Sequence, residues 1–81
     1  MISAIIQSVE FSTALKYYKL TPREVEVFML MIEGDTLDQI AEKLLITSST
    51  TQTHIKNMIE RTESKNRTEL IVKVIGYKVL T

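Results

Sequence analysis

The chain has 81 residues, of which 44% are apolar and 25% charged, and ten basic side chains balance ten acidic ones. This length predicts one small domain, and the ordinary composition excludes a low-complexity or disordered chain. Because there is no cysteine and a single histidine, His54, thiolate and histidine metal clusters are excluded and we expect no metal and no cofactor. No apolar stretch reaches the roughly 20 residues of a membrane-spanning helix, and the first residues lack the positive charge of a secretory signal, so we expect a cytoplasmic protein without membrane contact.

The charges are distributed unevenly along the sequence. Residues 21–45 carry two basic and six acidic side chains, whereas residues 46–81 carry six basic and three acidic ones. A basic end of this kind can meet a polyanion such as a nucleic acid. An ordinary solvated surface would give the same pattern, so the charge distribution alone does not decide between the two.

Apolar residues recur at helical spacing, and no segment shows the alternation of a strand. Over residues 3–18 they repeat at i, i+3, i+4 and i+7, which predicts an amphipathic helix. We assign residues 1–19 to this N-terminal helix, which could serve as an arm, a linker or a dimerisation element. Residues 20–81 are assigned to a separate helical domain.

Two further helices begin with a capping box, in which a hydroxyl caps the helix and a Glu or Gln follows three residues later. Thr21 and Glu24 form the first pattern, with a proline between them at the first helical position. Thr36 and Gln39 form the second, which opens a helix of about two turns. Gly34 predicts the end of the first of these helices, since glycine adopts a left-handed conformation without steric cost.

A short helix over residues 37–44, a tight break at residues 45–47 and a helix over residues 48–61 form the outline of a helix-turn-helix. One side of the last of these helices carries Ile55 and Met58 and is expected to be buried. The other side carries hydroxyls, amides and one ammonium group. Such groups can hydrogen-bond to base edges in a major groove, which admits one α-helix.

The final helix is expected over residues 68–80 and carries two apolar stripes. One stripe, which includes Val74, can bury in the core of the domain. The opposite stripe consists of Val72, Ile75 and Val79, and an exposed helix of a monomer should not be apolar on both sides. We therefore predict that Val72, Ile75 and Val79 meet either a second copy of the chain or the N-terminal helix.

An ordered series of short motifs covers most of the chain from residue 20 to about residue 78. Its members are Leu20–Val27, Glu33-Gly34, Ile40–Leu44, Ile46-Thr47, Thr50, His54–Met58 and Lys65–Glu69. This series resembles the DNA-binding domain of the LuxR/GerE (also NarL/FixJ) type of bacterial transcription regulator. The resemblance implies an all-α fold, a small four-helix helix-turn-helix bundle, to which the N-terminal amphipathic helix is added here.

The resemblance further implies that the helix over residues 48–61 enters the major groove of double-stranded DNA. It implies that the last helix is a dimer interface, which agrees with the second apolar stripe. The base-facing positions would be Ser49, Gln52, Thr53 and Lys56, and the phosphate-contacting positions would be Thr50, Asn57, Lys65 and Arg67.

Two hypotheses on function follow. The leading one is a DNA-binding transcription regulator that acts as a homodimer. The alternative is a protein-interaction module of the same fold that binds another transcription regulator or RNA polymerase rather than DNA. It is favoured by the zero net charge, by the apolar stripe of the last helix and by Gln52, which stands where the family usually has a lysine. No paired-carboxylate, glycine-loop or metal-ligand motif is present, so we expect no enzyme.

Two further departures from the family concern the helix over residues 48–61 itself. Thr51 stands where the family usually has a valine. Thr62 and Glu63 stand where it usually has leucine and glycine, so this helix is expected to end differently here.

Overall fold

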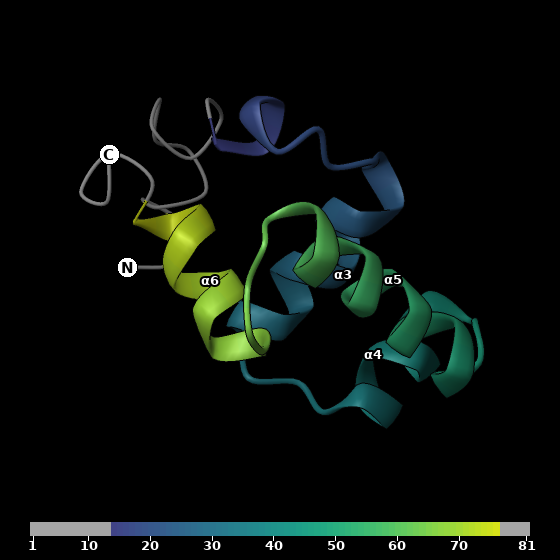
Figure 1. Cartoon of the computed structure of the whole chain (residues 1–81). Coiled ribbons are helices and arrows are strands. Elements are labelled where there is room, and N and C mark those ends of the chain that lie inside the picture. Colours follow the sequence, from purple (N-terminus) through teal and green to yellow (C-terminus); the bar gives the residue numbers. More distant parts are fainter. Residues whose placement is uncertain (1–13, 77–81) are drawn as a thin grey trace.

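The computed structural model describes residues 14–76, and the regular secondary structure of this part of the chain consists of helices, with no strand. The helices are α3 (Pro22–Ile32), α4 (Leu37–Leu44), α5 (Ser48–Arg61) and α6 (Arg67–Ile75), joined by short turns (Figure 1). Residues 14–17 add a helical turn before α3. The predicted all-α, helix-turn-helix architecture is confirmed.

Both predicted capping boxes are present. The Thr21 hydroxyl accepts from the Glu24 N–H at 3.1 Å, and the Glu24 carboxylate accepts from the Thr21 N–H at 2.9 Å. The Thr36 hydroxyl and the Gln39 side chain make the same reciprocal pair at 3.2 and 2.8 Å. These bonds satisfy backbone N–H groups that a helix start would otherwise leave without a partner, so α3 and α4 begin where the sequence predicts.

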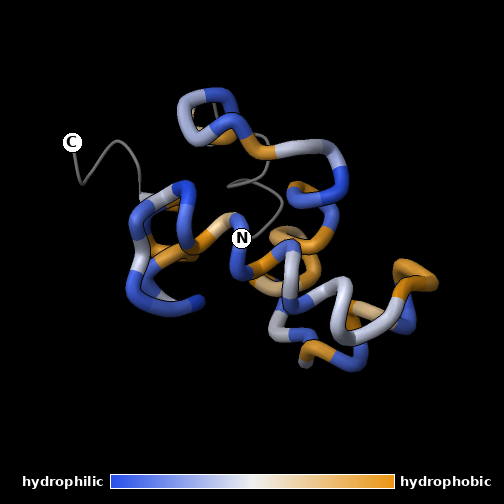
Figure 2. Tube along the Cα trace, turned by 45° about the vertical axis from the view of Figure 1, so that its right-hand side comes forward, coloured by the Kyte–Doolittle hydropathy of each residue, from blue (hydrophilic) through white to orange (hydrophobic). Residues whose placement is uncertain are grey.

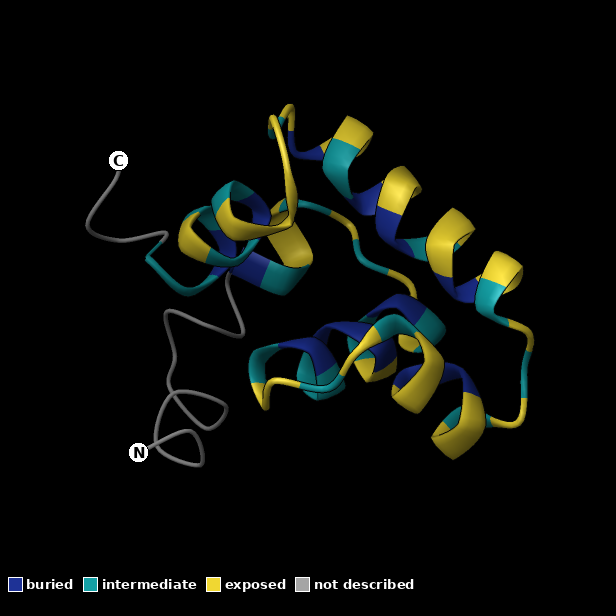
Figure 3. Cartoon of the chain, turned by 90° about the horizontal axis from the view of Figure 1, so that it is seen from below, coloured by how far each residue is buried: buried dark blue, intermediate teal, exposed yellow. Residues whose placement is uncertain are grey.

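The hydrophobic core lies between α5 and the other helices, since α5 contacts α3, α4 and α6. Figure 3 shows the helices with their buried sides turned toward one another and their exposed sides outward. Burying these apolar groups is the main favourable term that holds α5 in one orientation. The buried core residues are Ala14, Val27, Phe28, Met31, Ile40, Ile55, Met58, Leu70 and Val74.

The segment before α3 contributes to this core. Ala14 is fully buried, and Leu15 and Tyr18 pack against the buried cluster. The last turn of the predicted N-terminal helix therefore lies against the domain. Residues 1–13 are outside the described part of the chain, so the division into residues 1–19 and 20–81 stays a prediction.

The helical turn over residues 14–17 and the helices α3, α4 and α5 all end in the same hydrogen-bond pattern. At the end of α3, the Gly34 N–H donates to the Met31 carbonyl at 3.1 Å and the Asp35 N–H to the Leu30 carbonyl at 3.2 Å. This is a Schellman motif, and its central residue has a positive φ. The same pair of bonds is centred on Lys19, Leu45 and Glu63.

Only one of these four positions is a glycine. Gly34 has a φ of 94°, whereas Lys19, Leu45 and Glu63 have φ values of 55°, 56° and 56°. A side chain in this left-handed region approaches the following carbonyl oxygen and costs roughly 1–2 kcal/mol. Three turns of this small domain therefore carry backbone strain that a glycine would relieve.

The last helix differs from its predicted bounds. α6 begins at Arg67, one residue early, and ends at Ile75, with the Gly76 N–H bonded to the Val72 carbonyl at 2.8 Å. The apolar periodicity continues past Gly76, which is why the sequence predicts a helix to residue 80. Residues 77–81 lie outside the described part, and so does Val79. Over residues 14–76, no helix has the length and apolar character needed to cross a membrane.

Candidate nucleic-acid interface

The turn between α4 and α5 is set by Leu45, whose left-handed backbone reverses the chain. The Leu45 N–H donates to the Glu42 carbonyl at 3.3 Å, and the Ile46 N–H donates to the Ala41 carbonyl at 3.0 Å. Figure 2 shows this turn as a hydrophobic bend beside the paler tube of α5. Leu45 itself is 92% exposed, so its side chain contributes little to the core.

Hydroxyl groups fix the start of α5. The Thr47 hydroxyl accepts from the Thr50 N–H at 3.0 Å and donates to the Thr50 hydroxyl at 2.9 Å. The Ser48 hydroxyl donates to the Asp38 carboxylate at 2.5 Å, which ties α5 to α4. The cluster of small polar residues that is unfavourable inside a helix is therefore used to cap it.

The buried side of α5 accommodates Thr51, which stands where the family usually has a valine. This residue is fully buried, and its hydroxyl donates to the Thr47 carbonyl at 3.0 Å. A threonine therefore replaces the family's valine without leaving a buried polar group unsatisfied. Ile55 and Met58 continue the buried side, as the sequence predicts.

The opposite side of α5 is exposed along its length (Figure 3). The hydroxyl of Thr53 donates to the Ser49 carbonyl at 3.1 Å, which leaves its oxygen free to accept from an external donor. Arg67, at the start of α6, lines one cavity together with Gln52 and Lys56. The structure thus brings a predicted phosphate contact beside two predicted base contacts. The exposed predicted site residues are Ser49, Thr50, Gln52, Thr53, Lys56, Asn57, Lys65 and Arg67.

Three basic side chains of this surface are not used inside the domain. The ion pairs found among the described residues involve Arg23, Lys43, Arg61 and Lys73. Lys56, Lys65 and Arg67 take part in none of them. Their charges are therefore available to an external anion.

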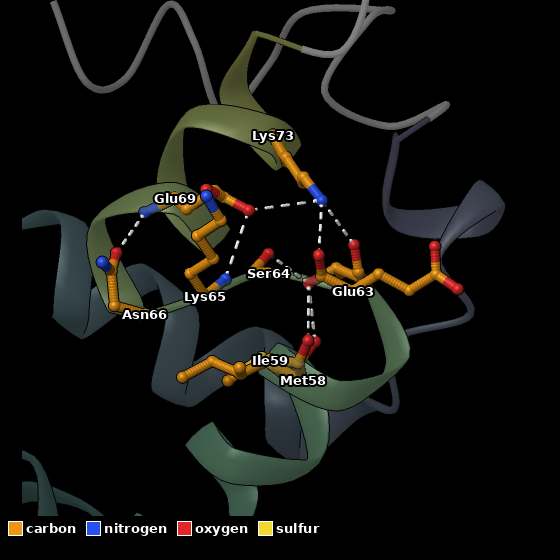
Figure 4. A network of polar contacts seen from close by, with 9 residues as sticks. Met58, Ile59, Glu63, Ser64, Lys65, Asn66, Glu69 and Lys73 are labelled. Carbon is orange, nitrogen blue, oxygen red and sulfur yellow. Dashed lines mark hydrogen bonds and ion pairs between the residues drawn. The ribbon is translucent and has the colours of Figure 1, made fainter.

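The turn between α5 and α6 is held by a network that the sequence does not predict (Figure 4). The Lys73 ammonium group donates to the carbonyls of Thr62 at 3.0 Å and Glu63 at 2.7 Å, and it pairs with Glu69 at 3.5 Å. The Glu69 carboxylate also accepts from the Lys65 N–H at 3.2 Å. A cation at the C-terminal end of α5 compensates the carbonyl dipoles there.

The end of α5 is formed by Thr62 and Glu63, which stand where the family usually has leucine and glycine. The Thr62 hydroxyl is buried and donates to the carbonyls of Met58 at 2.8 Å and Ile59 at 3.3 Å. Glu63 then takes the left-handed position of the Schellman motif. The helix ends at Arg61, and a glycine at position 63 would adopt the left-handed conformation without the steric cost that Glu63 carries.

A second unpredicted contact joins the end of α5 to the start of α3. The Arg61 guanidinium group donates to the Glu24 carboxylate, which is buried, and to the Lys19 carbonyl at 3.4 Å. Burial by itself raises the pKa of Glu24. The hydrogen bonds from Arg61 and from the Thr21 backbone, together with the Arg61 charge, outweigh burial and lower that pKa below its ordinary value. Arg61 therefore joins α5 to the start of α3 through one nitrogen of its guanidinium group.

No group of three or more histidine, aspartate or glutamate side chains that could hold a metal ion lies within residues 14–76. The exposed side of α5 and the turn after it carry hydroxyls, amides and cations, together with the carboxylates of Glu60 and Glu63. The hydroxyls, amides and cations can bind and orient a polyanion.

Comparison with known proteins gives a consistent result. Residues 18–74 match the family described as bacterial regulatory proteins, luxR family. The chain is 41% identical over 59 residues to the transcriptional regulatory protein LiaR of Bacillus subtilis (strain 168), which covers 73% of this chain and 28% of that protein. No solved structure matches the chain with comparable significance.

Two other relatives differ in how much of their own length this chain covers. The chain is 36% identical over 56 residues to the spore germination protein GerE of Bacillus subtilis (strain 168), covering 69% of the chain and 76% of GerE. It is 32% identical over 74 residues to the nitrate/nitrite response regulator protein NarL of Escherichia coli (strain K12), covering 91% of the chain and 34% of NarL. The chain thus spans about a third or less of the length of LiaR and NarL.

The family match covers α3 to α6 almost completely, so it includes the helix-turn-helix and the exposed polar side of α5. The fold, the buried pattern of α5 and the match agree with one another. The chain therefore belongs to the luxR family of bacterial regulatory proteins.

Proposed function

We propose that this chain binds double-stranded DNA by placing α5 in the major groove, and that it regulates transcription in the bacterial cytoplasm. The observation that carries the proposal is the exposed polar side of α5, because Lys56 on this side and Arg67 at the start of α6 have no ion-pair partner among the described residues. A polar helix held rigidly on a core and flanked by unpaired cations fits a groove lined by base edges and phosphates.

The proposed roles follow from side-chain chemistry. A glutamine can pair with adenine through two hydrogen bonds, and a lysine can donate to guanine. Hydroxyls, amides and cations at the margins can bind phosphate oxygens, which fixes the position of the helix without reading sequence. Ser49, Gln52, Thr53 and Lys56 are proposed to face bases, and Thr50, Asn57, Lys65 and Arg67 to contact phosphates.

We further propose that the chain acts as a homodimer through α6. Val72 is 50% exposed, whereas Ile75 packs partly against the core, and Val79 lies outside the described residues. A dimer would place two copies of α5 about 34 Å apart, one turn of DNA, and would recognise a pseudo-palindromic site. The proposed interface residues remain Val72, Ile75 and Val79.

The experiment that tests DNA binding is a fluorescence-anisotropy titration of a randomised duplex at low and moderate salt. The oligomeric state is measured on the same sample. We expect binding that weakens steeply as salt rises, because each phosphate contact releases a counterion. Selection of a preferred duplex from the pool would then define the operator.

A second candidate function is a protein-interaction module that binds another transcription regulator or RNA polymerase. Leu45, 92% exposed at the helix-turn-helix bend, and Val72 on α6 are apolar side chains that a protein partner could cover. A folded dimer that binds no duplex at low salt, but forms a salt-insensitive complex with such a protein, would favour this function over the first.

A further inference from the structure

A half-open cavity of about 200 Å³ lies beside α5. Its lining comes from three elements that meet there: the start of α4, four positions of α5 spaced at i, i+3, i+4 and i+7, and the start of α6. The cavity, which we call the α5 pocket, is lined by Leu37, Gln52, Ile55, Lys56, Ile59 and Arg67.

The α5 pocket combines an apolar surface with two cations. Leu37, Ile55 and Ile59 are partly or fully buried and supply the apolar part. Lys56 and Arg67 are exposed and make no ion pair with any described residue. Ligand sites have this general composition, a mostly apolar lining with a few polar groups that fix orientation.

None of the residues that line the pocket is acidic, and the nearest acid on α5 is the exposed Glu60, which follows Ile59. The nearest acid to Leu37 in sequence is Asp38, whose carboxylate accepts a hydrogen bond from Ser48. Glu69, near Arg67, is paired with Lys73. The first turn of α6 also contributes the partial positive charge of a helix start.

The size of the pocket limits its occupant. An apolar cavity of about 150 Å³ is enough to hold benzene, so the α5 pocket can take one ring or a short alkyl chain. We propose that it binds a small amphipathic carboxylate, with the apolar body against Ile55 and Ile59 and the carboxylate between Lys56 and Arg67. A ligand of so few atoms is expected to bind with a dissociation constant of about 1 mM.

The proposal has a regulatory consequence, which rests on the proposed DNA binding. Gln52 and Lys56 line the pocket and also belong to the side of α5 that is proposed to face bases. A bound carboxylate would neutralise Lys56 and Arg67 and obstruct the groove-facing surface. The ligand and DNA would therefore exclude each other.

Ligand binding is tested on the full chain, labelled with ¹⁵N, by following amide shifts during titration. Octanoate is the probe, octanamide is its neutral counterpart, and inorganic phosphate is an anion without an apolar body. We expect saturable shifts around Leu37, Ile55 and Ile59 with octanoate, and binding weaker by about threefold to tenfold with octanamide, since a charged hydrogen bond is lost. Phosphate should not shift Ile55 or Ile59.

Two variants locate the carboxylate. Arg67→Gln should weaken octanoate binding by about threefold to tenfold. Arg23→Gln, on the surface of α3 and outside the pocket lining, should leave octanoate binding unchanged. Shifts that map elsewhere, the absence of saturation, equal binding of octanoate and octanamide, or an unchanged affinity in Arg67→Gln would each overturn the proposal.

The competition is tested separately, by anisotropy of a DNA duplex with octanoate or phosphate at matched ionic strength. Octanoate should raise the apparent dissociation constant for DNA more than phosphate does. If octanoate fills the pocket but DNA affinity is unchanged, mutual exclusion is wrong. If no DNA binds at low salt, the proposed function fails, while the shift titration still decides whether the pocket takes a carboxylate.

Discussion

At the scale of single residues, the backbone of Glu63 offers a direct test of strain. Its φ of 56° is a left-handed conformation, and its side chain is exposed. The Glu63 carbonyl bonds to Lys73, and a glycine would keep that bond. We expect Glu63→Gly to raise the free energy of unfolding by about 0.5–1 kcal/mol, the relief of strain less the greater freedom of glycine in the unfolded chain.

Urea denaturation of the variant and of the parent chain measures this change. Glu60→Gly is the matched control, because Glu60 is exposed but lies inside α5 with helical backbone. That variant should lower the free energy of unfolding by about 1 kcal/mol. If Glu63→Gly destabilised the protein as Glu60→Gly does, the left-handed backbone would not be a source of strain.

Substitutions of two other residues should distinguish a contact with a base from a contact with a phosphate. Gln52→Ala should relax preference at one base pair, worth about 1–3 kcal/mol between the right and wrong base, because a bidentate contact is lost. Lys65→Ala should weaken binding to all duplexes alike and reduce the slope of log affinity against log salt by about 1. Competition titrations with single-base variants of the selected duplex measure both effects.

Lys43→Ala is the control for these two variants. Lys43 is an exposed lysine on α4, but it is paired with Asp35 at 2.7 Å and is not among the proposed contacts. Its removal should change neither base preference nor the salt slope. The docking of α5 would be contradicted if Gln52→Ala and Lys65→Ala behaved like Lys43→Ala.

At the scale of elements, α5 is fixed to α3 by the pair of Arg61 and Glu24. The pKa of Glu24 is lowered in the folded protein, so the folded state holds its proton less tightly than the unfolded state does. The stabilisation is therefore fully present above the ordinary pKa of a glutamate and is lost as the pH falls through the lower, folded value. Acid should weaken the packing of α5 on α3.

We expect Glu24→Gln to lower the free energy of unfolding by about 2 kcal/mol at neutral pH, because Arg61 loses its charged partner. This loss is smaller than that expected for a fully buried ion pair, because the Arg61 side chain is 35% exposed. Urea denaturation at about pH 7 and about pH 3 should show a smaller acid-induced loss in Glu24→Gln than in the parent chain.

Glu26→Gln is the matched control on the same helix. Glu26 pairs with Arg23 at 3.7 Å on the surface, where such a pair contributes at most about 0.5 kcal/mol. Equal effects of Glu24→Gln and Glu26→Gln would show that burial of Glu24 adds nothing.

The helix starts could be predicted from sequence because their signals are local. The capping boxes of α3 and α4 depend on side chains three residues apart, and the exposed side of α5 depends on helical periodicity. The left-handed backbones of Leu45 and Glu63 carry no such signal, since neither residue favours that conformation. They are imposed by the packing of the helices on either side of each turn.

The contacts that position the candidate site depend on residues distant in sequence. Arg61 and Glu24 are 37 positions apart, and their meeting requires α5 to lie across α3. One cavity is lined by Arg67, Gln52 and Lys56 together, and this arrangement likewise depends on how α6 packs against α5. Periodicity predicted which side chains are exposed, but it could not predict which of them share a surface.

At the scale of the whole molecule, affinity for DNA depends on how many phosphates are neutralised together. One copy of the chain offers few unpaired cations beside α5, so a single domain should bind weakly and a dimer should bind through two linked contacts. Val72 is the half-exposed apolar residue of α6 in the described chain. We expect Val72→Asp to convert the proposed dimer to a monomer without unfolding it.

Sedimentation velocity measures the oligomeric state, and anisotropy compares the selected palindromic duplex with a duplex that carries one half-site. Val72→Asp should lower affinity for the palindrome by about tenfold or more and leave half-site affinity unchanged, because only the linkage between two domains is lost. Leu45→Asn is the control: it removes a 92% exposed apolar side chain from the turn between α4 and α5, and asparagine tolerates the positive φ of that position. It should stay dimeric. If Val72→Asp also stays dimeric and binds the palindrome as the parent chain does, α6 is not the dimer interface, and the two copies of α5 must be linked through another surface.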